Sequence, residues 1–228
     1  GTTSFKCIFN RLKKNIRGKV CKMKEHIITD SEYIFKDYCD TKRIYHIAPV
    51  IKLKEILERG LKVDESCSSK YCDFNTYFDK YKPDSIPEWV SRKEAIYGSL
   101  NFRKDHKWHS HSVLLACKIH EERCWVGNEN LANILYEPFA LRDINIFPGV
   151  NSFLESHGKQ FVLRYWKNSL SFVENLVTRL DKYKGYDAEI LVMHDIPPED
   201  ISIISIISDH KIMSVDECNH IFSNMLQM

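Results

Sequence analysis

An acidic side chain, Glu189, stands at the start of an otherwise apolar run that ends at Val192. A carboxylate is out of place there unless it faces water or a site. Cleavage of a glycosidic bond passes through an oxocarbenium-like state, and a carboxylate beside the anomeric carbon stabilises that charge. Glu189 is therefore a candidate catalytic residue on a sugar ring, and an ordinary edge-strand charge is the alternative.

A second candidate pair is Tyr45-His46, near the end of a short run of β-forming residues that Pro49 closes. A histidine in this position can hold a ribose hydroxyl or a carbonyl while the strand fixes its direction. A histidine that fills a half-buried sheet position has the same sequence pattern, so the pattern alone leaves both readings open.

A metal site is not expected. The spacing of His106, His109 and His111, taken with Cys117 or Cys72, matches no standard zinc pattern and favours a solvated or acceptor-facing loop. Eight cysteines are scattered without a CxxC pair, which favours free thiols in a reducing compartment and a cytoplasmic location. Glu137 is the reserve carboxylate if Glu189 proves structural.

The elements that must position these residues can be read from local patterns. Residues 43–48 predict a strand, and residues 50–59 predict a helix that ends at Gly60, where a left-handed residue is favoured. Residues 187–193 and 201–207 predict two strands around a proline-containing turn. Short strands mixed with helices, without regular βαβ alternation, indicate an α+β fold.

The middle of the chain gives weaker patterns. Residues 64–87 predict a long loop, residues 89–91 a strand, and the following segment a helix that carries Ala95, Ile96 and Leu100. Residues 113–119 and 124–126 predict a hairpin, and residues 161–180 predict helix in one or two pieces. Neither GxGxxG nor GxxxxGK[ST] occurs, which excludes the two standard phosphate-loop fingerprints.

The charge distribution divides the chain unevenly. The formal net charge is +2, yet residues 1–24 hold eight Lys or Arg and no acidic residue, so the remainder carries about −6. Apolar residues recur every three or four positions there, which predicts a basic amphipathic helix within an extension over residues 1–40. Such a helix either binds a phosphate-rich partner, nucleic acid or a membrane surface, or packs its apolar stripe on the body, residues 41–228.

Two motifs together resemble a known family. Residues 43–61, RIYHIAPVIKLKEILERGL, resemble the opening motif of ADP-ribosyltransferase-fold proteins, and residues 188–201 resemble the strand that carries their catalytic glutamate. Both occur in this order in DarT-type DNA ADP-ribosyltransferases and related uncharacterised bacterial proteins. The resemblance covers about a third of the chain and implies split mixed or antiparallel β-sheets with flanking helices.

The resemblance assigns roles to individual residues. His46, with Tyr45, would bind NAD, and Glu189 would contact the nicotinamide ribose and aid loss of nicotinamide. Residues 89–97 match the middle motif, whose Ser91, Arg92 and Tyr97 would orient the pocket, hold a phosphate and stack on nicotinamide; Arg92 and Tyr97 also fit a surface charge and a core aromatic. Asp187 stands where arginine-specific transferases usually carry Glu, and would face the acceptor.

The implied activity is transfer of ADP-ribose from NAD, as co-substrate, to a macromolecular acceptor, nucleic acid or protein. Two alternatives use the same fold: an NAD glycohydrolase and an RNA 2′-phosphotransferase. A third is a module that binds NAD, ADP-ribose or nucleic acid without catalysis. The basic segment gives nucleic-acid binding some support, and no transmembrane segment is expected.

Overall fold

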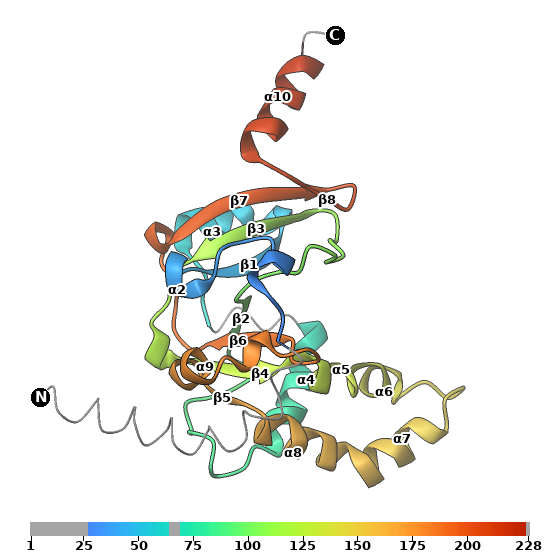
Figure 1. Ribbon diagram of the computed structural model, residues 1–228. Coiled ribbons are helices and arrows are strands. Elements are labelled where there is room, and N and C mark those ends of the chain that lie inside the picture. The colour runs from blue at the N-terminus through green and yellow to red at the C-terminus, as the bar shows by residue number, and fades with distance from the viewer. Residues whose placement is uncertain (1–26, 64–68, 227–228) are drawn as a thin grey trace, which may run out of the picture.

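The computed structural model describes residues 27–63 and 69–226, which form one eight-stranded sheet flanked by helices (Figure 1). The strand order is β5-β4-β6-β2-β1-β3-β7-β8, and every pair of neighbours is antiparallel. The strands are β1 Ile44–Pro49, β2 Ile96–Ser99, β3 Ser112–Cys117, β4 Cys124–Asn128, β5 Leu170–Ser171, β6 Ala188–Val192, β7 Ile201–Ser208 and β8 Lys211–Met213. The expected α+β class is confirmed.

The sheet is narrow at its middle. β1 and β2 are joined in register by the single pair Tyr45 and Ser99, whereas β1 and β3 match over six residue pairs. The result is two half-sheets, β5-β4-β6-β2 and β1-β3-β7-β8, which lie one above the other in Figure 1. The two half-sheets remain connected as one sheet, and the described ladders are antiparallel with no mixed pairing.

Helices cover both faces of the sheet. They are α2 Tyr38–Thr41, α3 Leu53–Arg59, α4 Ser69–Lys80, α5 Glu129–Asn133, α6 Tyr136–Leu141, α7 Gly149–Phe153, α8 Lys159–Lys167, α9 Phe172–Thr178 and α10 Val215–Met225. One core cluster packs α4 and α8 against Trp125 of β4 and Leu191 of β6. A second packs α3 and α9 against the opposite face, where Ile190 and Val192 point. Alternation along β6 thus divides its side chains between two cores.

The first motif folds as its pattern predicts. β1 is followed by a helical turn at residues 50–52 and then by α3, whose last residue is Arg59. Gly60 has a φ of +78°, and a Cβ there would overlap the carbonyl oxygen of Ile196. A glycine is needed because Leu61 forms a backbone bridge with Ile196 at this point. This bridge fixes the end of α3 beside the turn that follows β6.

Three local predictions in the middle of the chain are wrong. Residues 69–80 of the expected loop form α4, residues 89–91 form no strand, and the segment expected to be helical contains strand β2. β2 is extended because β1 and β6 pair with its two edges, and this tertiary pairing overrides a short helical pattern. β3 and β4 exist as predicted but do not pair with one another; β3 lies between β1 and β7, and β4 between β5 and β6.

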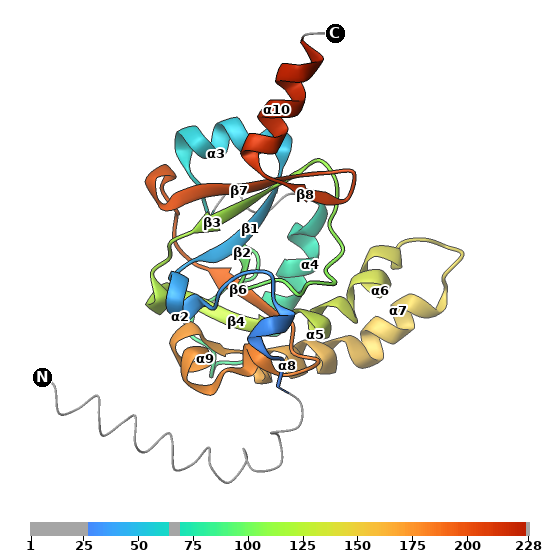
Figure 2. The same cartoon turned by 45° about the horizontal axis from the view of Figure 1, so that its top comes forward.

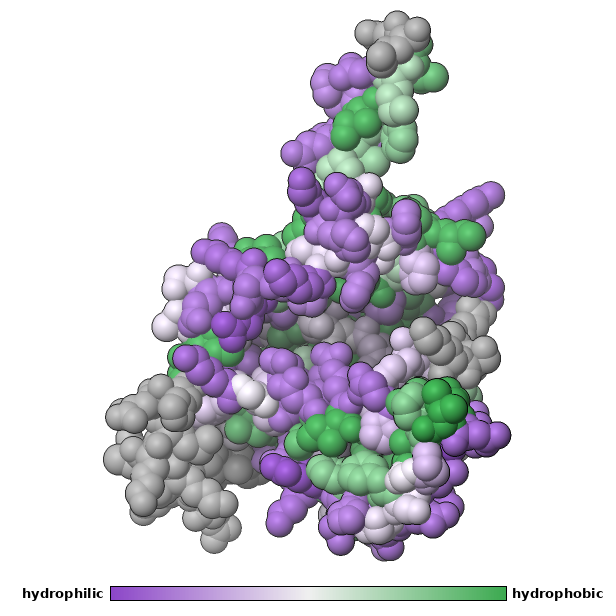
Figure 3. All heavy atoms as spheres, turned by 90° about the vertical axis from the view of Figure 1, so that its right-hand side faces the viewer, coloured by the Kyte–Doolittle hydropathy of each residue, from purple (hydrophilic) through white to green (hydrophobic). Residues whose placement is uncertain are grey.

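The segments before β1 and after β8 lie at the two ends of the chain. The predicted basic helix falls in residues 1–26, which lie outside the described residues. Residues 27–40 contact the sheet domain through bridges from Ile27 to Tyr183 and from Tyr33 to Arg103. At the other end α10 projects away from the sheet with apolar side chains exposed along it (Figures 2 and 3). Across the described parts of the chain, every helix is too short or too polar to cross a bilayer.

Candidate functional site

Glu189 lies on β6 in the lower half-sheet and is only 7% exposed. Its cross-strand neighbours are Ser99 on β2 and Gly127 on β4. Directly opposed residues of antiparallel strands point to the same face, so these three positions form one row across the sheet. The row ends at Tyr45 on β1, the residue that joins the two half-sheets.

Two side chains hold the Glu189 carboxylate. Arg92 donates from Nη1 to Glu189 Oε1 in a buried ion pair, and Tyr165 on α8 donates its hydroxyl to the same oxygen at 2.6 Å. Arg92 Nη1 also donates to the Tyr165 hydroxyl at 2.5 Å, which closes a three-membered network. Both bonds fall on Oε1, and Oε2 accepts no hydrogen bond from any residue in the described parts of the chain.

The network sits in an aromatic cage. The Arg92 guanidinium lies 4.7 to 5.4 Å from the ring centroids of Phe78, Tyr97 and Tyr165, distances at which a cation is attracted to an aromatic face. Burial opposes the charge of Arg92, but the adjacent Glu189 outweighs it and holds the arginine pKa well above its usual value. Burial and the same carboxylate raise the pKa of Tyr165. The arginine is therefore charged and the tyrosine neutral at ordinary pH.

Three further features define the surroundings of Arg92 and Tyr165. A Cβ on Gly127 would overlap the Tyr165 hydroxyl, so a glycine is required for Tyr165 to reach Glu189. Arg92 Nε is buried without a hydrogen-bond partner among the described residues. Ser91 and the Arg92 backbone N–H both donate to Asp79 of α4, at 2.8 and 2.9 Å, which fixes the turn that delivers Arg92.

The middle motif lies beside Glu189, but its residues contact protein groups where the resemblance implies contacts with NAD. Arg92 pairs with the carboxylate itself, and Tyr97 donates its hydroxyl to the Arg92 carbonyl oxygen at 2.6 Å. Tyr97 lies on strand β2, two residues before Ser99. Ser91 contacts Asp79 and is therefore a residue that orients the turn.

The first motif does not bring His46 to Glu189. Because Tyr45 shares a face with Ser99 and Glu189, the adjacent His46 points to the opposite face. Its Nδ1 lies 2.7 Å from the Tyr97 carbonyl oxygen, across the narrow junction of the half-sheets. Burial lowers the pKa of His46, so the ring is neutral. Tyr45 is buried in a third core cluster, stacked on Phe35.

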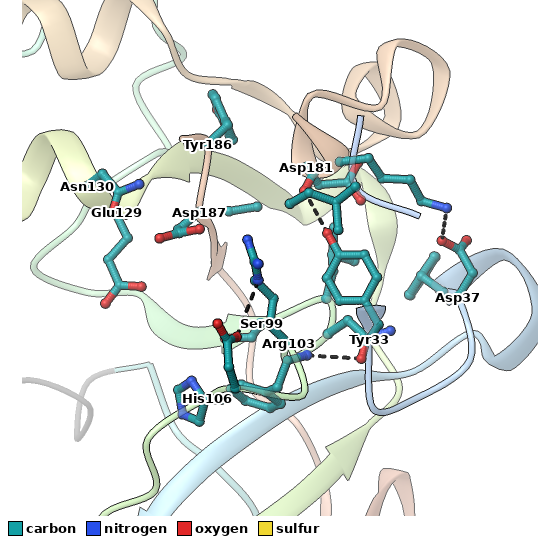
Figure 4. Close-up of a pocket in the computed structure, with 18 of the residues that line it drawn as sticks. Tyr33, Asp37, Ser99, Arg103, His106, Glu129, Asn130, Asp181, Tyr186 and Asp187 are labelled. Carbon is teal, nitrogen blue, oxygen red and sulfur yellow. Dashed lines mark hydrogen bonds and ion pairs between the residues drawn. The ribbon is translucent and has the colours of Figure 1, made fainter. Parts of the chain in front are cut away.

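A pocket of about 290 Å³ opens beside this row, where β2 ends and β6 begins (Figure 4). Ser99, the direct neighbour of Glu189, lies in its wall. Five carboxylates line it against two basic side chains, Arg103 and Lys182. The polar lining residues are Tyr33, Asp37, Tyr38, Ser99, Asn101, Arg103, Asp105, His106, Glu129, Asn130, Asn133, Asp181, Lys182, Tyr186 and Asp187. The pocket is thus strongly acidic.

Two of these carboxylates are adjacent. The Glu129 backbone N–H donates to the Asp187 carbonyl oxygen at 2.8 Å, which ties the start of α5 to the start of β6. Both side chains lie on the same side of the pocket in Figure 4. Partial burial and the negative charges of Glu189 and Asp187 raise the pKa of Glu129. In the described parts of the chain, no basic side chain forms an ion pair with either residue.

The remaining acidic side chains have different environments. Asp37 and Asp181 accept hydrogen bonds from Arg179 at 2.7 and 2.8 Å, and Lys182 also contacts Asp37. Asp105 lies 3.4 Å from Arg103. Glu129 and Asp187 are therefore the carboxylates best placed to meet a ligand.

The other sequence candidates lie apart from this pocket or contribute to it weakly. Glu137 is exposed on α6 and is not among the pocket residues. His106 lines the pocket and contacts the rings of Phe102 and Trp108. Within the part of the chain that the structure describes, no three His, Cys, Asp or Glu side chains are arranged to hold a metal ion.

Comparison with protein-family models, curated proteins and solved structures finds no match to this chain. The chemistry of the site must therefore be inferred from its own geometry and from the sequence resemblance.

Sequence reasoning missed two site residues, Tyr165 and Glu129. Tyr165 lies in a helical run with ordinary core spacing, so nothing local marks its hydroxyl as a partner of Glu189. Glu129 has a weak local signal: it follows the buried strand β4, and Asn128 caps the helix that it opens. An acidic residue at the end of a buried strand is a weaker signal than an acidic residue at the start of one, which identified Glu189.

Proposed function

We propose that this protein is an NAD-dependent ADP-ribosyltransferase that binds the nicotinamide ribosyl end of NAD in the acidic pocket beside Glu189. The observation that carries the proposal is the position of the pocket: its wall includes Ser99, the cross-strand neighbour of a buried, pre-oriented carboxylate. A volume of about 290 Å³ suits one end of the dinucleotide, since pockets for whole small molecules commonly span ~300–1,000 Å³.

The charge of the pocket matches that end of NAD. The nicotinamide ring carries a formal positive charge, and the ribosyl group becomes cationic as the ring departs. Carboxylates around such a centre stabilise the developing charge, because they act in a partly enclosed site where water screens less. Asp187 supplies a pocket-facing carboxylate at the start of β6, and Glu189 lies two residues further along the same strand.

Glu189 does not itself line the pocket, but it follows Ala188, which does, and the proposal has one of its oxygens contact the sugar. Arg92 and Tyr165 fix Oε1, while Oε2 has no hydrogen-bond partner among the described residues. A carboxylate held in this way loses little freedom when a ribose hydroxyl binds to its second oxygen. Nicotinamide would leave with the electron pair of the C–N bond, and an acceptor would then attack the anomeric carbon.

One alternative has a specific observation in its favour. The ion pair with Arg92 neutralises Glu189, which supports a module that binds NAD or ADP-ribose without turnover. An RNA 2′-phosphotransferase is less favoured, because phosphate groups would enter a pocket with five carboxylates and two basic side chains.

The test is release of nicotinamide from NAD by the wild-type protein, with single-stranded DNA, RNA and a protein lysate offered in turn. Glu189→Gln should cut turnover by about 10²–10³-fold while leaving NAD binding measurable by calorimetry. Glu199→Gln, the same change at an exposed position outside the pocket, is the matched control and should turn over normally.

Because Glu189→Gln removes the partner of buried Arg92, its melting temperature must be compared with that of the wild type. Ser99→Leu provides a second variant: it leaves the ion pair intact, narrows the pocket, and should abolish NAD binding. Normal turnover in both variants would rule out this site. NAD binding without nicotinamide release under any condition would favour the binding module, and no binding at all would overturn both.

A further inference from the structure

Glu129 has no part in the cleavage step described above, yet it lines the pocket and remains accessible there. Its backbone is fixed by the hydrogen bond to Asp187, and the side chain of Asn128 caps the first turn of α5 by accepting from the Asn130 N–H at 3.1 Å. The backbone that carries this carboxylate is therefore fixed by hydrogen bonds, while the carboxylate itself is exposed to a ligand in the pocket. Such a group is suited to accept a proton.

We propose that Glu129 is the general base that takes the proton of the acceptor, with Asp187 beside it, and that the acceptor is a hydroxyl or amino group on a neutral or positively charged molecule. This inference rests on the proposed function. It adds a residue and a substrate class that the sequence did not indicate.

The step balances without a further reactant. Nicotinamide departs as a neutral molecule with the electrons of its bond to the ribosyl carbon. The acceptor oxygen or nitrogen forms the new bond to that carbon with its lone pair, and its proton passes to a Glu129 carboxylate oxygen. Glu129 then releases the proton to water.

The acceptor class follows from the charges around the pocket. A nucleotide acceptor would bring at least one phosphate beside Glu129 and Asp187, where like charges repel and no described basic side chain pairs with either residue. Arg103 extends into the middle of the pocket in Figure 4, but its Nε is already within 3.4 Å of Asp105. A neutral or cationic acceptor meets no such penalty.

The charged surroundings also set the pH range of the step. Asp187 and Glu189 raise the pKa of Glu129, together with partial burial, while Arg92 and a hydrogen bond with Asn133 oppose them. Arg103, Asp105 and His106 are further titratable groups that line the pocket. A base must be deprotonated to act, so transfer should increase with pH through a value above the usual ~4.3 of a glutamate.

A comparison of two small nucleophiles distinguishes proton removal by Glu129 from its other effects on the transfer rate. Methanol must lose a proton as it attacks, whereas azide attacks without one. The experiment supplies NAD with methanol or with sodium azide and quantifies methyl ADP-ribose, ADP-ribosyl azide and nicotinamide by mass spectrometry. Glu129→Gln keeps the shape of the side chain, and Glu137→Gln on α6 is the matched control outside the pocket.

Glu129→Gln should lower methyl ADP-ribose formation by about 10²-fold or more. ADP-ribosyl azide formation should stay the same or rise, because the variant also removes a charge that repels the azide anion. Glu129→Asp should recover part of the methanol reaction. Equal loss with both nucleophiles, or no loss with methanol, would overturn the role of Glu129.

The acceptor class is tested separately with lysine-rich peptide and single-stranded DNA at equal concentration. Modification of the peptide and not the DNA is expected, and preferential DNA modification would overturn the charge argument. If the wild-type protein releases no nicotinamide at all, the proposed function fails first, and this outcome is distinct from an altered ratio of the two adducts.

Discussion

At the scale of single residues, neither Arg92 nor Glu189 can be replaced alone without a cost in stability. Both side chains are less than 10% exposed, and each would be strongly disfavoured there without the other. Removing one partner of a buried ion pair commonly costs ~3–5 kcal/mol, while replacing both by apolar residues of similar volume is often neutral.

Arg92→Met should therefore lower the free energy of unfolding by about 3–5 kcal/mol, because Glu189 is left charged and unpaired. The double variant Arg92→Met/Glu189→Leu should regain most of that loss. Urea unfolding followed by circular dichroism measures both. A double variant as unstable as the single one would show that the aromatic cage, and not charge compensation, dominates.

Gly127 offers a second residue-scale prediction. Gly127→Ala places a methyl group where the Tyr165 hydroxyl lies, so α8 or β4 must shift, at a cost of about 1–3 kcal/mol. Gly149→Ala is the matched control, since a Cβ there meets nothing within 4 Å. Thermal unfolding of the two variants should give a clearly lower midpoint for position 127 alone.

The sequence identified part of this residue-scale picture. Glu189, Arg92 and Tyr97 could be identified because the motifs that suggested them are local. The fold brings these three residues together. Tyr165 and Glu129 escaped notice, since their significance depends on which distant strand or helix they meet. His46 shows the limit of motif reasoning: the register of β1 turns it to the face opposite Glu189.

At the scale of elements, strands and helices with strong local patterns were predicted well. β1, α3, β6 and β7 combine apolar runs with clear proline or glycine boundaries. β2 was missed because four residues carry too little pattern, and its extended form depends on pairing with β1 and β6. Helix α4 was missed although its buried Phe74 and Phe78 lie one helical turn apart, because polar residues fill most of its other positions.

Ion pairs join the segment before β1, residues 27–43, to the segment that precedes β6. Arg179 contacts Asp37 and Asp181, and Lys182 contacts Asp30 and Asp37. Burial works against ionisation of Asp37, but hydrogen bonds from Arg179, the Cys39 N–H and Lys182 outweigh it and hold its pKa well below the usual range.

This depressed pKa predicts a pH dependence of stability. Asp37 contributes fully above about pH 4, the unfolded-state value, and its contribution is lost as the pH falls further toward the folded-state value. Asp37→Asn should therefore be less stable than wild type at pH 7, with the difference shrinking at pH 2 to 3. Urea unfolding at both pH values tests this; a difference that is constant with pH would contradict it.

At the scale of the whole molecule, α10 stands apart from the two half-sheets (Figures 1 and 2). Ile221, Phe222 and Met225 are 45%, 60% and 64% exposed, and no residue of the helix is buried. Truncation after Ser214 should therefore shift the thermal midpoint by less than about 3 °C. A larger loss, measured by calorimetry, would show that the helix packs against the body.

The order of strands has a consequence for how the chain folds. β6 inserts between β2 and β4, and β7 pairs with β3, so strands made late complete sheets begun early. Loops of many residues must close before these contacts form, and such non-local topologies fold slowly. A ribosome that has released only the residues before Asp187 holds two unfinished half-sheets, and neither the Glu189 row nor its pocket can exist until the last fifth of the chain emerges.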